Sequence, residues 1–336
     1  MDLSVVFYGT GGSVPTARRA TACVLIRAGG ARVLIDCGEG AQRQMIASTG
    51  LVQVDDILIT HFHADHYLGL PGLLKTWDLQ ERRMPLRIAG PRGLRDLFEA
   101  LRRIFGKIRY PVELIELEPG EALPGEGFEM RAFPVEHRMR ANGYAFVEPD
   151  RPGRFDAEAA RSLGVSDVRD FGRLQRGDPV AVDGGEVRPE QVMGEARRGR
   201  KLVVTGDTAP SEMTSVAAHE AELLVHDGTF TEEESARAAE TGHSTARDAA
   251  TLAREAEVKM LALVHISTRY HVRAVIDEAR EAFPNAHAVR DFDLVEIPFP
   301  ERGDPRLIEG GATERRESPS EGAESPSEVL DAREQE

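Results

Sequence analysis

Apolar runs alternate with glycine-rich turns and amphipathic stretches along the first 300 residues of the chain. Short apolar runs bounded by turn residues predict buried strands, and apolar positions that recur every three or four residues predict helices. Strands are predicted at 3–7, 22–27, 32–36, 56–60, 86–89, 114–117, 128–135, 143–147, 201–205, 223–225 and 260–265. Helices are predicted at 41–48, 70–80, 92–104, 246–255 and 272–282. Strands in blocks with helices between them indicate a layered α/β (or α+β) architecture.

Two segments depart from this pattern. Residues 148–200 are rich in Gly, Pro, Asp and Arg, and contain only short apolar runs. We interpret them as an insert or mobile arm, with an ordinary surface excursion as the alternative. Residues 301–336 carry 11 acidic and 5 basic side chains and few apolar ones, so they form a predicted disordered acidic tail.

The composition narrows the class of protein. A net charge of −15 argues against a protein that binds nucleic acid over its whole surface, although local binding stays possible. No apolar stretch is long enough to cross a membrane, and the first residues do not resemble a signal peptide. The two cysteines, Cys23 and Cys37, do not make a disulfide framework. We therefore expect a cytoplasmic protein with no membrane partner.

The segment Thr60-His61-Phe62-His63-Ala64-Asp65-His66 is the strongest candidate for chemistry. It holds three of the 10 histidines of the chain and an aspartate, directly after an apolar run. Imidazole suits zinc and similar ions, and a carboxylate serves as ligand or as base. His61 and His63 can point the same way on an extended turn, while Asp65 and His66 face a second point. One loop could thus supply ligands to two metal ions.

Three further ligand types follow apolar strands: His137, Asp207 and His265. Sheets of this class place their sites at the carboxyl ends of strands, so we expect these side chains to join the histidine loop. Asp207 is the natural bridge, since a carboxylate has two oxygens. The two predicted ligand sets are His61, His63, His137 and Asp207 for one ion, and Asp65, His66, Asp207 and His265 for the other.

The motifs as a whole resemble the metallo-β-lactamase superfamily. The matching segments are 9–11 with 14–16, 36–40 with 42–45, 61–72, 206–208 and 265–270. The runs Asp-Cys-Gly-Glu-Gly and His-Ile-Ser-Thr-Arg-Tyr are similar to those of the ribonuclease Z family, the endonucleases that trim the 3′ end of precursor tRNA.

This resemblance, which covers residues 3–298, implies a four-layer αββα sandwich over residues 1–300. It implies that residues 148–200 are a flexible tRNA-binding arm. It further implies two Zn²⁺ ions per subunit (Mn²⁺ or other divalent ions being possible), precursor tRNA as substrate, a 3′-hydroxyl left on the tRNA, and a homodimer.

The resemblance also assigns roles to residues. Asp65 would act on the attacking water, whose pKa two metals would lower. His243 is the candidate acid for the leaving 3′-oxygen, backed by Asp227; the alternative is a histidine near a helix start without chemistry. The family normally has glutamate at the position of Asp227, one methylene longer, and a Gly-Pro pair in the arm that is missing here. Ser267 and Arg269 would hold a flanking phosphate.

Two other functions are compatible with the same sequence features. A small-molecule hydrolase of the same fold, such as a phosphodiesterase, lactonase or thioesterase, would share the histidine loop. A non-catalytic RNA-binding or scaffold protein would be expected to have lost ligands, whereas every expected ligand position is filled.

Overall fold

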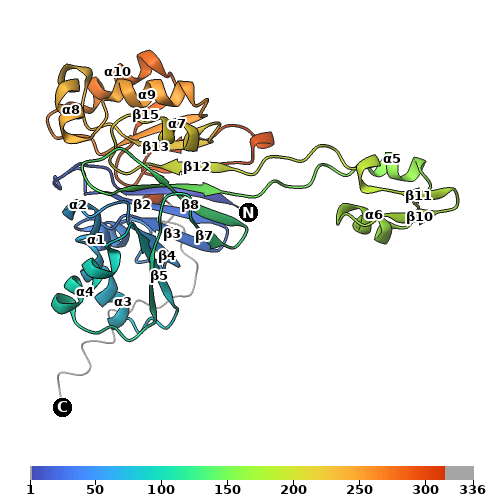
Figure 1. Cartoon of the computed structure of the whole chain (residues 1–336), viewed down its shortest axis with the longest axis horizontal. Coiled ribbons are helices and arrows are strands. Elements are labelled where there is room, and N and C mark those ends of the chain that lie inside the picture. Colours follow the sequence, from blue (N-terminus) through green and yellow to red (C-terminus); the bar gives the residue numbers. More distant parts are fainter. Residues whose placement is uncertain (1, 315–336) are drawn as a thin grey trace.

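The computed structural model describes residues 2–314, and within them two mixed sheets lie face to face (Figure 1). The first sheet has the order β17-β16-β1-β2-β3-β4-β5-β6 and the second has the order β15-β14-β13-β12-β9-β8-β7. The strands of the first are β1 (Leu3–Gly9), β2 (Cys23–Ala28), β3 (Ala31–Ile35), β4 (Asp56–Leu58), β5 (Leu86–Gly90), β6 (Val112–Glu116), β16 (Leu294–Glu296) and β17 (Arg306–Ile308). Those of the second are β7 (Ala122–Gly125), β8 (Phe128–Pro134), β9 (Asn142–Val147), β12 (Lys201–Val204), β13 (Leu223–Asp227), β14 (Met260–Val264) and β15 (Ala286–Ala288).

Helices cover the outer face of each sheet, which gives the predicted four αββα layers (Figure 1). One layer contains α1 (Ala41–Ala47), α2 (Ala64–Tyr67), α3 (Leu70–Leu79) and α4 (Leu94–Phe105). The other contains α7 (Glu212–Ala218), α8 (Ser235–Thr241), α9 (Ala246–Glu255) and α10 (Val272–Ala282). The described residues also form three short 3₁₀ turns, η1 (Pro189–Gln191), η2 (Glu232–Glu234) and η3 (Pro300–Arg302), and a short helix near the end of the described chain, α11 (Gly311–Glu314). No helix among residues 2–314 is long and apolar enough to cross a membrane.

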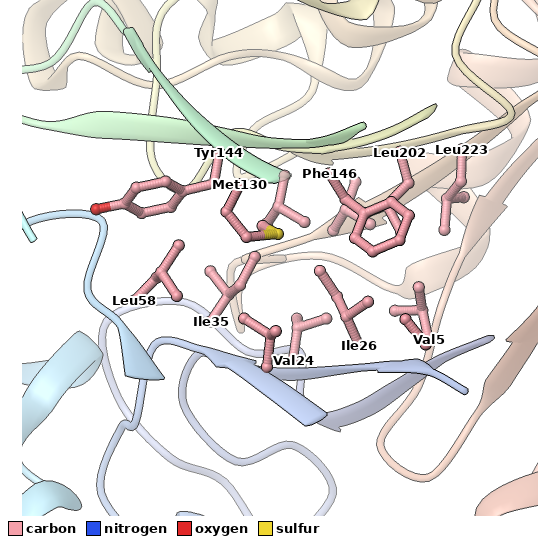
Figure 2. Close-up of a cluster of buried hydrophobic side chains, with 14 of the residues drawn as sticks. Val5, Val24, Ile26, Ile35, Leu58, Met130, Tyr144, Phe146, Leu202 and Leu223 are labelled. Carbon is pink, nitrogen blue, oxygen red and sulfur yellow. The ribbon is translucent and has the colours of Figure 1, made fainter. Parts of the chain in front are cut away.

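The main core lies between the two sheets (Figure 2). Figure 2 shows Val24, Ile26 and Ile35 of the first sheet facing Met130 and Phe146 of the second. Because side chains alternate along a strand, the strands of the two sheets other than β7 also contribute to a helix-facing core. All of β1 is buried for this reason. Strands buried on both faces read as continuous apolar runs, which explains the sequence pattern.

The segment between β9 and β12 leaves the sandwich as two long legs that end in a small folded unit (Figure 1). This unit contains α5 (Ala157–Ser162), α6 (Val168–Gln175) and the hairpin of β10 (Val180–Val182) and β11 (Gly185–Val187). Its short apolar runs meet in a core of their own around Phe171, Leu174 and Val187. The sequence did not predict these elements, because none of the runs is periodic over a useful length.

The prediction of a disordered tail from residue 301 is wrong for residues 301–314. There β17 pairs antiparallel with β16, with Val295 opposite Leu307, and Ala312 is buried. The tail was predicted from composition, but this strand is ordered by backbone pairing to an existing sheet edge. The rest of the predicted tail, residues 315–336, lies outside the described residues. The structure also contains β7, β15, β16, α7 and α8, which the sequence pattern missed.

Candidate metal centre

The seven predicted metal ligands meet at one end of the two sheets. The histidine loop follows β4, and its second half forms α2, with His63 as the residue before the helix. His137 follows β8, Asp207 follows β12 and His265 follows β14. The structure thus brings together His61, His63, Asp65, His66, His137, Asp207 and His265.

The first predicted ligand set forms a compact group of nitrogen and oxygen atoms. His63 Nδ1 lies 3.0 Å from His61 Nε2 and 3.2 Å from His137 Nε2. Asp207 Oδ2 lies 3.6 Å from His61 Nε2. All four potential ligand atoms lie within 4.8 Å of one another, which is the spacing of donors around a single ion.

The second predicted set adjoins the first through Asp207. Asp65 Oδ2 lies 3.6 Å from His66 Nε2 and 3.4 Å from His265 Nε2. The two oxygens of Asp207 lie 3.4 Å from His66 Nε2 and 3.3 Å from His265 Nε2. Asp207 therefore stands between the two groups, at the position predicted for the bridging carboxylate.

The imidazoles are held in place from behind. In four of the five rings, Nδ1 contacts an outer group and leaves Nε2 to face the centre, an arrangement typical of metal-binding histidines. The outer groups are Thr60 Oγ1 for His61 (3.0 Å), Asp36 Oδ2 for His66 (2.7 Å), the Gly242 carbonyl for His137 (2.8 Å) and Thr229 Oγ1 for His265 (2.7 Å). His63 instead presents Nδ1 to the centre.

The electrostatics fit a divalent cation. Burial holds the pKa of His61 well below its usual value, which favours the neutral ring that metal binding requires. Burial opposes charging of His265, but the Asp207 and Asp65 carboxylates outweigh it and raise its pKa to about 9. His66 Nε2 and Asp207 Oδ1 are buried and make no hydrogen bond among the described residues. Buried polar atoms without partners are costly, and an ion between them would satisfy both.

His243 lies beside this centre and is oriented by an acid. Its Nδ1 is 2.7 Å from Asp227 Oδ2, and its ring stacks on His265 with centroids 5.1 Å apart. The shorter acid therefore reaches the histidine in spite of the missing methylene. Asp227 is itself fixed by Thr229, whose backbone N–H and Oγ1 donate to Oδ1 at 2.8 and 2.6 Å.

Comparisons with known proteins identify the family. The sequence profile of the metallo-β-lactamase superfamily matches residues 16–265. Ribonuclease Z of Methanosarcina acetivorans is 44% identical over 301 residues, which covers 88% of this chain and 99% of that protein. The chain belongs to the ribonuclease Z family. Ribonuclease Z of Haloferax volcanii is 46% identical over 305 residues, covering 89% of this chain and 96% of that protein.

A solved structure of the family agrees. The crystal structure of the short form of human tRNase Z superposes with a TM-score of 0.63 at 27% identity, covering 88% of this chain and 99% of that chain. The predicted family and the predicted metallo-β-lactamase fold are therefore confirmed, and the chain is a ribonuclease Z-like hydrolase.

In this ribonuclease Z family member, a cavity of about 260 Å³ opens beside the centre. His243, Ser267 and Arg269, which the sequence placed at the substrate, all line it. One nitrogen of Arg269 pairs with Glu234 at 3.0 Å, so a bound phosphate would share this guanidinium with a carboxylate. The cavity is also lined by Arg237 of α8, a second cation that the sequence analysis missed because α8 was not predicted.

The outer partners of the imidazoles were also missed. Asp36 belongs to the motif that carried the resemblance, but nothing in the sequence pairs it with His66, 30 positions away. Asp36 has a left-handed backbone, with φ 58°, and this turn directs its carboxylate toward Thr60 and His66. Thr229 belongs to the segment aligned with the family motif, yet its contact with His265 depends on the pairing of β13 with β14.

Proposed function

We propose that this protein is an endoribonuclease that removes the 3′ trailer from precursor tRNA and leaves a 3′-hydroxyl on the tRNA. The observation that carries the proposal is Asp207, which stands between two ligand groups next to the His243–Asp227 pair. Relatives that share nearly their whole length with this chain bear the names ribonuclease Z and tRNase Z, which supports the substrate.

Two divalent ions per subunit are part of the proposal, with zinc preferred because five of the seven ligands are imidazoles. Mn²⁺ and other divalent ions fit the same donor types less specifically. The ligands would be the two sets of side chains described above. When bound, such a pair supplies Lewis acidity, which lowers the pKa of water and offsets charge on the scissile phosphate.

The side chains of this chain have separate tasks in the proposed reaction. Asp65 would orient the attacking water and accept its proton; its Oδ2 is held by the backbone N–H of Ser13 at 2.9 Å. His243 would give a proton to the leaving 3′-oxygen of the tRNA through Nε2, while Asp227 holds Nδ1. Ser267 and Arg269 would bind a phosphate that flanks the scissile one.

The arm and the quaternary structure complete the proposal. Residues 148–200 would contact the tRNA away from the cleavage site; from Arg151 to Lys201 the chain carries 11 basic and 9 acidic side chains, within an acidic protein. A homodimer would let the arm of one subunit serve the site of the other. The exposed apolar side chains of Ile46 and Leu68, which border one surface hollow, support a protein interface on that face. We further propose that the protein works in the cytoplasm.

The experiment is cleavage of a precursor tRNA that bears a 3′ trailer, with Zn²⁺ or Mn²⁺ present. The proposal requires cleavage after the discriminator base, lost on chelation and restored by adding metal. A protein that hydrolyses small phosphodiesters, lactones or thioesters but leaves the precursor intact would be the alternative hydrolase. A metal-loaded protein that binds tRNA without any cleavage would be the non-catalytic alternative.

A further inference from the structure

The two legs of the arm meet at their base under a segment from the far end of the chain. Arg151 on the outgoing leg and Arg197 on the returning leg face each other, and each donates its backbone N–H to the other's carbonyl at 2.8 Å. Residues 299–302, which we term the C-terminal clasp, lie against this pair. Of these, residues 301 and 302 belong to the stretch that composition alone assigned to a disordered tail.

One carboxylate of the clasp binds both legs. Glu301 accepts two hydrogen bonds from Arg151, Nη1 to Oε1 and Nη2 to Oε2, each 2.8 Å long. Its Oε1 also accepts one from Arg197 Nη1 at 3.1 Å. The bidentate pair fixes direction as well as distance, because the planar guanidinium matches the carboxylate plane. The Glu301 side chain is 25% exposed, so water screens these contacts only in part.

An aromatic ring of the clasp lies under the same arginines. The Arg151 and Arg200 guanidiniums lie 3.8 and 4.0 Å from the centroid of Phe299. Arg200 is buried, pairs with Glu148 at 2.6 Å and donates to the Ile297 carbonyl at 2.8 Å. Cation–π contacts of this kind gain strength where the cation is removed from water. The clasp is thus tied to the sandwich and to both legs at once.

We propose that the C-terminal clasp sets the direction of the arm relative to the metal centre, with Glu301 as the positioning residue. Beyond Arg151 and Arg197 the two legs are held to each other by backbone hydrogen bonds from Gly194 N to the Arg154 carbonyl (2.9 Å) and from Asp156 N to the Val192 carbonyl (2.8 Å), beside the bridge between Phe155 and Met193. A two-stranded ribbon without further packing is only marginally stable in water, so its direction depends on contacts at its base. Because the folded unit lies far out on these legs, a small change of angle at the base moves it a long way (Figure 1). The expected effect on tRNA binding, that the clasp helps the arm to place the tRNA at the metal centre, rests on the proposed function.

The test compares Glu301→Gln, which keeps size and removes charge, with Glu281→Gln as a control. Glu281 also pairs with an arginine, Arg247, at 2.7 Å, but on α10 in the sandwich. Arm direction is measured by electron spin resonance between nitroxides on Ala100→Cys in α4 and Ala181→Cys in β10. Both positions are exposed, whereas the native Cys23 and Cys37 are 1% and 0% exposed, so labelling is selective.

With Glu301→Gln we expect a broader distance distribution, KM for precursor tRNA raised about 3- to 10-fold, and kcat little changed. Hydrolysis of bis(p-nitrophenyl) phosphate, which does not need the arm, should stay at the wild-type rate and shows that the variant is folded. Glu281→Gln should change none of these. Phe299→Leu, which keeps an apolar side chain but removes the ring, should broaden the distribution in the same way.

An unchanged distance distribution in Glu301→Gln would refute the proposal that the clasp sets the direction of the arm. A broader distribution with unchanged KM overturns its role in placing tRNA. If the wild-type protein does not cleave precursor tRNA, the proposed function fails, and the distance measurement still decides whether the clasp directs the arm.

Discussion

Asp227→Asn tests whether His243 acts as an acid, and its effect can be worked out from four hydrogen bonds. Asp227 Oδ1 accepts from Thr229 N and Oγ1, while Oδ2 accepts from Thr208 N at 3.1 Å and contacts His243 Nδ1 at 2.7 Å. An asparagine has one oxygen and one NH₂ group. Keeping the oxygen at Oδ1 preserves both bonds from Thr229, so we expect the NH₂ group to replace Oδ2.

Two consequences follow from that orientation. The Thr208 N–H then faces a donor, and a buried unsatisfied donor costs about 1–3 kcal/mol. The Asp227 side chain is 0% exposed, so the wild-type protein bears the cost of burying a carboxylate. The neutral asparagine avoids that cost, which offsets part of the loss. We therefore expect the free energy of unfolding to fall by about 1–2 kcal/mol. Because the NH₂ group of the introduced asparagine is a donor, His243 must present Nδ1 as an acceptor, which places its remaining proton on Nε2. The substitution also removes the carboxylate anion that faces the ring in the wild-type protein.

The activity of the variant separates acid catalysis from metal binding. We expect the rate constant for cleavage of precursor tRNA, measured in single turnovers with saturating enzyme, to fall about 10²- to 10⁴-fold. Metal content, measured by atomic emission, should stay at the wild-type level, because no ligand has changed. Bis(p-nitrophenyl) phosphate has a leaving group that needs no proton, so its hydrolysis should fall far less. Equal losses on both substrates, with full metal content, would refute the acid role of His243.

Four further predictions address other parts of the molecule. Asp65→Ala should abolish cleavage but leave binding of precursor tRNA nearly intact in a filter-binding assay; full activity would exclude its proposed role. Asp36→Asn should weaken metal binding about 10- to 100-fold by freeing the His66 ring, as measured by competition with a chromophoric chelator; unchanged affinity would contradict this. Leu58→Ala, in the core between the sheets, should lower the free energy of unfolding by about 2–5 kcal/mol in urea titrations. Deletion of residues 152–196 should weaken precursor tRNA binding and flatten its salt dependence, while hydrolysis of small diesters continues; unchanged affinity would refute the role of the arm.

Most of the predicted metal ligands could be found from the sequence because they follow strands that are buried on both faces; the exception is His137, because β8 before it leaves Arg131 exposed. Such strands read as apolar runs, and the polar residue after each run, Asp207 or His265 for example, is conspicuous. Element boundaries in these regions agree closely, as for the strand predicted at 201–205 and observed as Lys201–Val204. The outer partners could not be found in this way. The contact of Asp36 with His66 depends on parallel pairing of β3 with β4, which the local pattern does not specify.

The arm and the segment that holds its base show the same division between local and long-range information. The sequence determined by itself which residues can bind a metal, act on a proton or form a strand, because these depend on side-chain chemistry and local periodicity. It also placed the break in the fold at residues 148–200. Only the tertiary structure decided that Glu301 is ordered and holds Arg151 and Arg197 together. That outcome depends on a sheet edge and two arginines brought in from 104 and 150 positions away, and long-range pairing of this kind leaves no signal in local composition.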